Sequence, residues 1–150
     1  QILVFGLGQQ GIAAAFGIGQ VAEIFEPGSV MAVPLASRYV RGIANWRGGP
    51  IAVLDLAARL GLPVVASTCE RLLVVRTSTD GGFVAFPVGA DVRLYGLPLP
   101  YRRCANAPLL DQSLVRGIYD LDGTTIVVPD VNRIVDPNSA AIPAEMAATD

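Results

Sequence analysis

The sequence predicts a mainly β protein, and two observations carry this prediction. Short apolar runs alternate closely with turn residues, which is typical of a small barrel or sandwich. The tetrapeptide Val-Arg-Gly-Ile also occurs twice, at residues 40–43 and at 115–118. Each copy leads into a turn and an apolar run that ends near an aspartate, Asp55 or Asp130. Because the surroundings repeat together with the tetrapeptide, the chain is expected to contain two related halves.

We therefore expect an all-β fold of two pseudo-symmetric, five-stranded SH3-like barrels with short helical turns. Residues 1–66 would form the first barrel and residues 67–137 the second, together making one domain. The chain has 150 residues, which suits one domain or two small lobes that share a core. The Ala-rich segment 138–150 is expected to be a frayed tail.

Strands of the first half are expected where apolar residues cluster between turn signals. Residues 9–11 would form a hairpin turn, and Gly17 with Gly19 indicates a bend before the third strand. Residues 26–29 (Glu-Pro-Gly-Ser) would end that strand, and residues 30–37 are expected to be a connector. The expected strands are residues 1–8, 12–16, 21–25, 39–45 and 51–54.

The stretch Tyr39–Gly61 contains the clearest local signals of the chain. Residues 48–50, Gly-Gly-Pro, predict a turn because Gly permits positive φ and Pro presets its own φ. The apolar run 51–54 suits a strand buried on both faces. Asp55 is then expected to cap a short helix, and Gly61 to supply its left-handed end.

The second half repeats this order of elements. Asp122-Gly123 predicts a tight hairpin, because both residue types tolerate positive φ. Residues 97–110 are rich in Pro, Arg and Ala and are expected to form a loop, and residues 130–135 suit a helical turn or a strand end. The expected strands are residues 71–76, 83–88, 92–96, 114–120 and 124–128.

The composition argues against an enzyme and against a cofactor. The chain has no His, which removes Ser-His and Cys-His nucleophile pairs and most zinc sites. It also has no Lys, which removes a P-loop, a Schiff base and a lipoyl or biotin attachment point. We therefore predict no catalytic residue, no cofactor and no metal.

Three patterns are interpreted as structural. Residues 6–11 match the dinucleotide-binding pattern Gly-x-Gly-x-x-Gly, but the glycines that follow make a poor helix, so a Gly-rich hairpin is favoured. Asp80 and the pair Asp120 and Asp122 are interpreted as solvated turn residues and not as cation ligands. The cysteines at positions 69 and 104 are interpreted as reduced thiols, with a disulfide left open.

The composition also indicates which partners to expect. There is no basic run for nucleic acid, no apolar run long enough to span a bilayer, and no recognisable signal peptide. The chain is 52% hydrophobic with a net charge of −2, which indicates that apolar surface meets protein partners.

The central stretch resembles that of the chemotaxis coupling proteins, the CheW family. These proteins carry Asn-Leu-Arg-Gly, then Pro-Val-Ile-Asp-Leu, then Leu-Gly. At this spacing the chain has residues 45–48 (Asn-Trp-Arg-Gly), 52–56 (Ala-Val-Leu-Asp-Leu) and 60–61 (Leu-Gly). It departs at Trp46, where the family has an aliphatic residue, and at Ala52, where it has Pro. The resemblance implies two SH3-like barrels and a cytoplasmic, non-catalytic adaptor between chemoreceptors and a CheA-type histidine kinase.

The same resemblance implies a partner-binding site. It places Glu23 and Arg47 near one another, and the planar guanidinium of Arg suits a carboxylate, so we expect the two to pair. Val21 and Gly48 would contribute to a groove for the helical tip of a receptor. Trp46 is interpreted as a core residue, with a contact anchor as the alternative. The alternative to a Glu23–Arg47 pair is that each residue is an ordinary solvated strand residue.

Two other functions are considered. The chain would be a CheW-like module of a larger protein, such as a coupling protein fused to a receiver domain or a kinase regulatory domain. A small β-barrel hydrolase is the remote alternative, because the sequence offers no converging acid and base.

Overall fold

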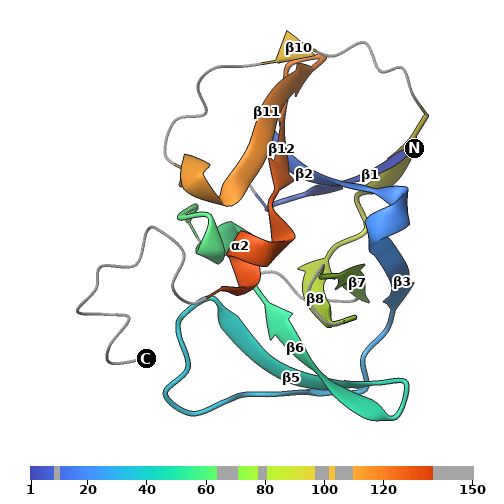
Figure 1. Ribbon diagram of the computed structural model, residues 1–150, viewed down its shortest axis with the longest axis vertical. Coiled ribbons are helices and arrows are strands. Elements are labelled where there is room, and N and C mark those ends of the chain that lie inside the picture. The colour runs from blue at the N-terminus through green and yellow to red at the C-terminus, as the bar shows by residue number, and fades with distance from the viewer. Residues whose placement is uncertain (9–10, 64–70, 78–80, 97–101, 104–109, 137–150) are drawn as a thin grey trace.

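The computed structural model describes residues 1–8, 11–63, 71–77, 81–96, 102–103 and 110–136 (Figure 1). These residues form twelve strands, the short helices α1 (Leu56–Arg59) and α2 (Val131–Val135), and two 3-10 turns, η1 (Ile18–Gln20) and η2 (Gln112–Leu114). The predicted mainly β fold with short helical turns is confirmed. In the described ranges, no helix is long and apolar enough to cross a membrane.

The strands form two sheets with the same pattern of pairing. In each sheet one pair of neighbours is parallel, β12 with β2 or β6 with β8, and the other pairs are antiparallel. One sheet has the order β10 (Arg102–Arg103), β11 (Val115–Leu121), β12 (Thr124–Pro129), β2 (Ile12–Gly17), β1 (Ile2–Gly6) and β9 (Val92–Tyr95). The other has the order β4 (Val30–Met31), β5 (Val40–Trp46), β6 (Gly49–Leu54), β8 (Phe83–Val88), β7 (Arg71–Arg76) and β3 (Val21–Phe25).

Each sheet combines strands from both halves of the sequence. The hairpin β1–β2 lies in one sheet with β9–β12, and the hairpin β7–β8 lies in the other sheet with β3–β6. The structure thus differs from the expectation that residues 1–66 and 67–137 each build their own barrel. The order of elements repeats, but the leading hairpins are exchanged. The boundary near residue 66 lies outside the described residues. We call the unit of β3–β8 the Glu23 barrel and the unit of β1, β2 and β9–β12 the Arg93 barrel.

The exchange follows from hairpins that are apolar on both faces. Along β1, Leu3 and Phe5 face one buried cluster while Val4 faces another, and Leu73 and Val74 divide in the same way on β7. Since strand side chains alternate between faces, such a hairpin needs cover on two sides. One face therefore fills its own barrel, and the other faces the neighbouring barrel.

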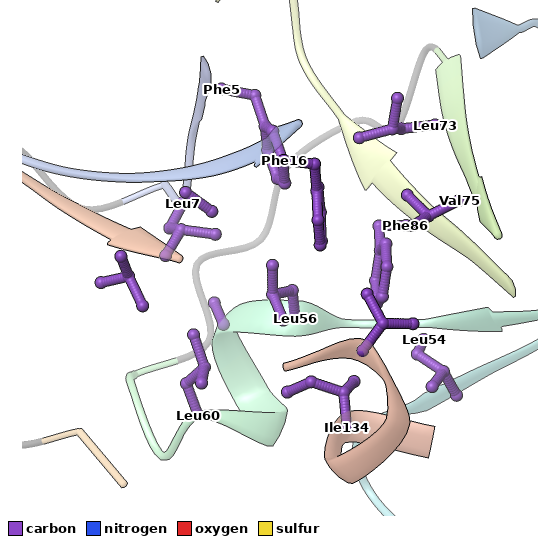
Figure 2. Packing of buried hydrophobic residues seen from close by; sticks show 14 of the residues in the cluster. Phe5, Leu7, Phe16, Leu54, Leu56, Leu60, Leu73, Val75, Phe86 and Ile134 are labelled. Atoms are coloured by element: carbon purple, nitrogen blue, oxygen red, sulfur yellow. The ribbon is translucent and has the colours of Figure 1, made fainter. Parts of the chain in front are cut away.

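The faces by which the two hairpins contact the neighbouring barrel meet in one buried cluster, the central cluster (Figure 2). Phe16 on β2 lies between Phe5 on β1 and Phe86 on β8, with ring centroids 5.9 and 5.7 Å away. Leu56 and Leu60 from α1 and Ile134 from α2 cover this cluster. Aromatic rings bury large apolar areas, so this stack is a main source of cohesion between the barrels.

The repeated tetrapeptide carries a bulge in both copies. A register shift falls between Val40 and Gly42 in β5 and between Val115 and Gly117 in β11, as a β-bulge produces. Gly42 has φ 148°, and a Cβ there would lie 2.1 Å from the Met31 carbonyl oxygen, so only glycine fits.

Aspartate caps begin both helices, as the sequence indicated for the first. The carboxylate of Asp55 accepts from the amide of Ala58, and that of Asp130 accepts from the amide of Arg133. Gly61 has φ 85° and ends α1 in the predicted left-handed conformation.

Some local predictions need correction. The run 51–54 is not buried on both faces, because Ala52 is exposed on the outer side of β6. The expected connector contains the two-residue strand β4, and the expected loop 97–110 contains β10. The antiparallel pairing of β1 with β2 supports a hairpin at the Gly-x-Gly-x-x-Gly pattern. Predictions for Cys69, Asp80, Cys104 and residues 138–150 fall outside the described residues.

A buried arginine joins α1 to α2. Arg59 is only 5% exposed, and its guanidinium donates to the carbonyl oxygens of Ile134, Arg133 and Asp136 at 3.0, 3.2 and 3.0 Å. The ring of Tyr39 lies 4.7 Å from its central carbon. Carbonyls at a helix end lack intrahelical partners, and a cation there also complements the helix dipole. Arg59 thereby ties the two halves of the chain together.

Phe16→Ala is expected to lower the free energy of unfolding by about 3–5 kcal/mol, because it leaves a cavity inside the central cluster. Urea denaturation followed by circular dichroism measures this loss. Leu35→Ala is the control, since Leu35 is 100% exposed and its truncation should change stability by less than about 0.5 kcal/mol. Equal effects of the two variants would contradict the assigned role of the stack.

Candidate functional site

Glu23 and Arg47 meet on the surface of the Glu23 barrel. Glu23 lies on β3, and Arg47 follows β5 in the turn to β6. The Arg47 Nε atom donates to Glu23 Oε1 at 2.9 Å. The two side chains are 64% and 36% exposed, so solvent screens their attraction and the pair contributes little to stability. The structure brings together the two residues that the resemblance paired.

The turn holds Arg47 in a fixed position at the end of a hairpin. Trp46 pairs with Gly49, so Arg47 and Gly48 are the two turn residues, with φ values of 49° and 78°. Positive φ at both positions is the mark of the type I′ turn, whose twist matches that of the strands. The guanidinium therefore projects from a rigid two-residue loop. Gly48 contributes backbone geometry, and a Cβ there would meet no atom within 4 Å.

Trp46 connects this ion pair to the barrel interior. Its Nε1–H donates to Glu23 Oε1 at 2.6 Å, and its ring lies 4.8 Å from the ring of Phe83. The guanidinium carbon of Arg47 stands 4.7 Å above the indole, within the range of a cation–π contact. The half-buried indole packs against the core of the barrel and reaches the surface at one end. This packing agrees with the interpretation of Trp46 as a core residue, and its role as a contact anchor stays a prediction.

The contact between Trp46 and Glu23 also shows that the sheet closes on itself. In the sheet order, β3 is one edge strand and β5 is next to the other edge. A 2.6 Å hydrogen bond between their side chains requires the sheet to curl until the two strands face each other. The site therefore lies at the seam of the barrel.

Val21 starts β3 next to the crossing between the barrels. It is half-buried and packs against the central cluster, with a register shift between it and Glu23. Arg76 Nη1 donates to the carbonyl oxygens of Gly19 and Val21, both at 3.1 Å, which fixes the start of this strand. The structure thus brings Glu23, Trp46 and Arg47 together, whereas Val21 lies two positions before Glu23 on the side of the central cluster.

Sequence reasoning missed Phe83 and Arg76 as supports of the site. Phe83 begins the hairpin partner of β7, and nothing local signals that it meets Trp46, because the two lie in different halves of the chain. Arg76 ends an apolar strand, which is an ordinary place for a solvated charge. Only the hairpin exchange places Arg76 beside β3 and brings Phe83 into contact with Trp46.

This site holds charged and aromatic groups at the surface. A guanidinium and an indole are groups that are enriched in binding hot spots, and here one carboxylate holds both of them. Among the described residues, no group of three or more Cys, Asp or Glu side chains is arranged to hold a metal ion. The arrangement can pair with charges and apolar side chains of a protein partner.

A two-barrel fold with such a surface defines a protein-binding module. The family model described as CheW-like domain matches residues 1–138, so this chain belongs to the CheW-like domain family. The chemotaxis protein CheW of Thermotoga maritima is 25% identical over 137 residues, which cover 91% of this chain and 87% of that protein. These findings confirm the resemblance inferred from the central stretch.

A solved structure shows the same fold. The scaffolding protein TtCheW from Thermoanaerobacter tengcongensis superposes with a TM-score of 0.72 at 23% sequence identity. The similarity covers 92% of this chain and 88% of that one. The family is one of non-catalytic chemotaxis adaptors.

A double-mutant cycle between Trp46→Phe and Glu23→Ala is expected to give a coupling energy of about 1 kcal/mol, because the first change removes the indole donor and the second its acceptor. Urea unfolding of the four proteins measures the coupling. The control cycle pairs Trp46→Phe with Arg93→Ala in the other barrel and should be additive within about 0.3–0.5 kcal/mol. Additivity in both cycles would show that the hydrogen bond contributes nothing.

Proposed function

We propose that this protein is a non-catalytic adaptor that couples chemoreceptors to a CheA-type histidine kinase in signalling arrays. The observation that carries the proposal is the Trp46–Glu23–Arg47 cluster at the seam of a CheW-like barrel. The output would be chemotaxis, or else pilus-driven or surface motility. The same role applies if this domain is one module of a longer protein.

The cluster suits the cytoplasmic tip of a chemoreceptor, which is helical in the receptors that CheW-family proteins bind. An amphipathic helix needs an apolar strip to cover and a few fixed charges that set its register. Val21 supplies partly exposed apolar surface, while Arg47 is the most exposed member of the cluster. Because Glu23 and Trp46 already hold Arg47, little side-chain entropy is lost when a partner binds.

A second surface is proposed for the kinase. Large exposed apolar side chains gather along β4, the loop after it and the adjoining position of β5, and we call this surface the apolar edge. Met31 is 72% exposed and Leu35 is 100% exposed. Contiguous apolar surface of this kind marks protein contacts. The members of the apolar edge are Val30, Met31, Val33, Leu35 and Ile43.

The apolar edge also has a suitable geometry for an adaptor. It lies along β4 and at Ile43 of β5, whereas the Trp46–Glu23–Arg47 cluster lies at the turn after β5 and on β3. The proposed role requires that both partners bind at once. An end-to-end contact between a barrel of this protein and a matching barrel of the kinase is heterologous and can build rings.

Arg47→Glu is expected to weaken binding to a purified cytoplasmic fragment of a chemoreceptor from the same organism by on the order of tenfold to a hundredfold, because it puts a carboxylate beside Glu23 and removes the guanidinium. Isothermal calorimetry or co-sedimentation with receptor arrays measures the change. Arg38→Glu is the charge-matched control, since this exposed residue precedes the other end of β5. If both variants bind like wild type, the assigned receptor site is wrong.

Met31→Glu is expected to lower affinity for the regulatory domain of the kinase while receptor binding stays unchanged, because a buried carboxylate in an apolar contact is costly. The same two binding assays, run on Met31→Glu and Arg47→Glu in parallel, should show opposite losses. A variant that loses both partners would point to a folding defect, which its thermal unfolding curve would reveal. Loss of neither partner by Met31→Glu would remove the apolar edge from the proposal.

A further inference from the structure

The two barrels can be compared position by position. The repeated tetrapeptide and its bulge align β5–β6 with β11–β12, and both pairs continue into an Asp-capped helix. The hairpins align as well, because Val74 pairs with Ala85 as Val4 pairs with Ala15. On the edge strands, Glu23 lies opposite Val74 as Arg93 lies opposite Val4. The positions that match are Trp46 with Leu121, Arg47 with Asp122, Phe83 with Ala13, Glu23 with Arg93, and Phe25 with Tyr95.

The end of the Arg93 barrel that matches the Trp46 site is hollow. A cavity of about 410 Å³ opens there. Leu121 and Ala13 line it, at the positions where Trp46 and Phe83 stack in the Glu23 barrel. An indole and a phenyl ring are thus replaced by an isobutyl and a methyl group, and the difference leaves open space.

The charges around this opening are reversed. Arg93 stands where the Glu23 barrel has Glu23, and Asp122 stands where it has Arg47. The match extends to the backbone, since Asp122 and Gly123 have φ values of 49° and 86°, as in the Arg47-Gly48 turn. Both Arg93 and Asp122 line the cavity, together with Asp91.

These charges are loosely held, in contrast to the Glu23–Arg47 pair. Arg93 Nε lies 3.7 Å from Asp91 Oδ1, and the two side chains are 73% and 76% exposed. Among the described residues, Asp122 takes part in no salt bridge. The rim therefore carries two carboxylates and one guanidinium. No indole holds these charged groups in place, in contrast to Trp46 in the Glu23 barrel.

We propose that this opening of the Arg93 barrel is a binding pocket for a large aromatic side chain of a partner protein, next to a basic residue of that partner. The aromatic ring would occupy the space that Trp46 and Phe83 fill in the other barrel. The basic residue would pair with Asp122 at the rim. This site lies on a different barrel from the proposed receptor site and does not depend on it.

The lining of the pocket supports an aromatic occupant. Its floor is apolar, formed by Val4, Ala13, Leu121 and Ile126, with the ring of Tyr95 on the side. Its volume lies near the lower end of the range of about 300–1,000 Å³ that is usual for ligand pockets, which suits one ring system and not an extended ligand. Trp and Tyr are the side chains that most often anchor an interface by filling such a pocket.

The charge of the rim supports the basic neighbour. Because two carboxylates face one guanidinium, a cation is favoured beside the ring and an anion is disfavoured. The chain contains an internal example of this pairing, since the ring of Trp46 and the guanidinium of Arg47 are adjacent and bind one carboxylate together. A Trp-Arg segment of a partner would reproduce it at Asp122.

The test uses the dipeptide N-acetyl-Trp-Arg-amide as the probe. It is titrated up to its solubility limit into the methyl-labelled full chain, and NMR shifts are followed. Saturable ring-current shifts are expected at the methyl groups of Val4, Ala13 and Ile126. N-acetyl-Ala-Arg-amide should cause none of these shifts, because it lacks the ring. Equal binding of the two dipeptides, or shifts confined to other methyl groups, would overturn the proposal, as would no saturable shift with the Trp probe.

Two variants complete the test. Leu121→Trp should abolish probe binding by filling the pocket from within, and its thermal unfolding should be as cooperative as that of wild type, since the matching position already holds Trp46. Asp122→Arg, a change at an exposed turn, should reverse the preference from the Trp-Arg probe to N-acetyl-Trp-Glu-amide. Unchanged binding in Leu121→Trp, or an unchanged preference in Asp122→Arg, would show that the probe binds elsewhere and would overturn the proposal. The Asp122→Arg result decides the matter if Leu121→Trp fails to fold.

Discussion

Burial of the two exchanged hairpins on both faces is the constraint on which the rest of the structure depends. Each hairpin places one row of side chains inside a barrel and the other row against the neighbouring barrel, where Phe5, Phe16 and Phe86 stack. Neither barrel would keep a complete sheet without the hairpin that the other half of the sequence supplies. The two barrels are therefore expected to unfold together, which is unusual for lobes that look like separate units.

The shared core also positions the Trp46–Glu23–Arg47 cluster, because the chain passes from β2 into β3. The chain leaves the central cluster at Phe16, passes the turn η1 and enters β3, where Val21 still contacts that cluster. Glu23 follows two positions later and holds Trp46 and Arg47. The position of these groups is thus set by the shared core and by Arg76, which donates to the carbonyls of Gly19 and Val21 at the start of β3. Under the proposed function, a partner would meet groups that are already in place.

Much of this architecture could be predicted from local sequence signals, and the rest could not. The repeated tetrapeptide identified the pseudo-symmetry because its glycine is required at a bulge, as the close approach to Gly42 shows. Turn and cap residues such as Asp55 and Gly61 act within a few positions and were predictable. The hairpin exchange was not, since strand periodicity does not say which sheet a strand joins. The contact of Trp46 with Phe83 depends on that exchange.

The comparison of the two barrels suggests how one scaffold can carry two kinds of surface. The backbone requirements, a bulge, a two-residue turn and an Asp-capped helix, are kept in both copies. The residues around the opening face no such requirement and differ in size and charge. In the Glu23 barrel the tilted pair of Trp46 and Phe83 covers the barrel end, and the indole holds the charges at the rim. In the Arg93 barrel small side chains leave the interior open. On the two proposals made above, the covered barrel end would present its surface to a partner, whereas the open end would admit a side chain from a partner.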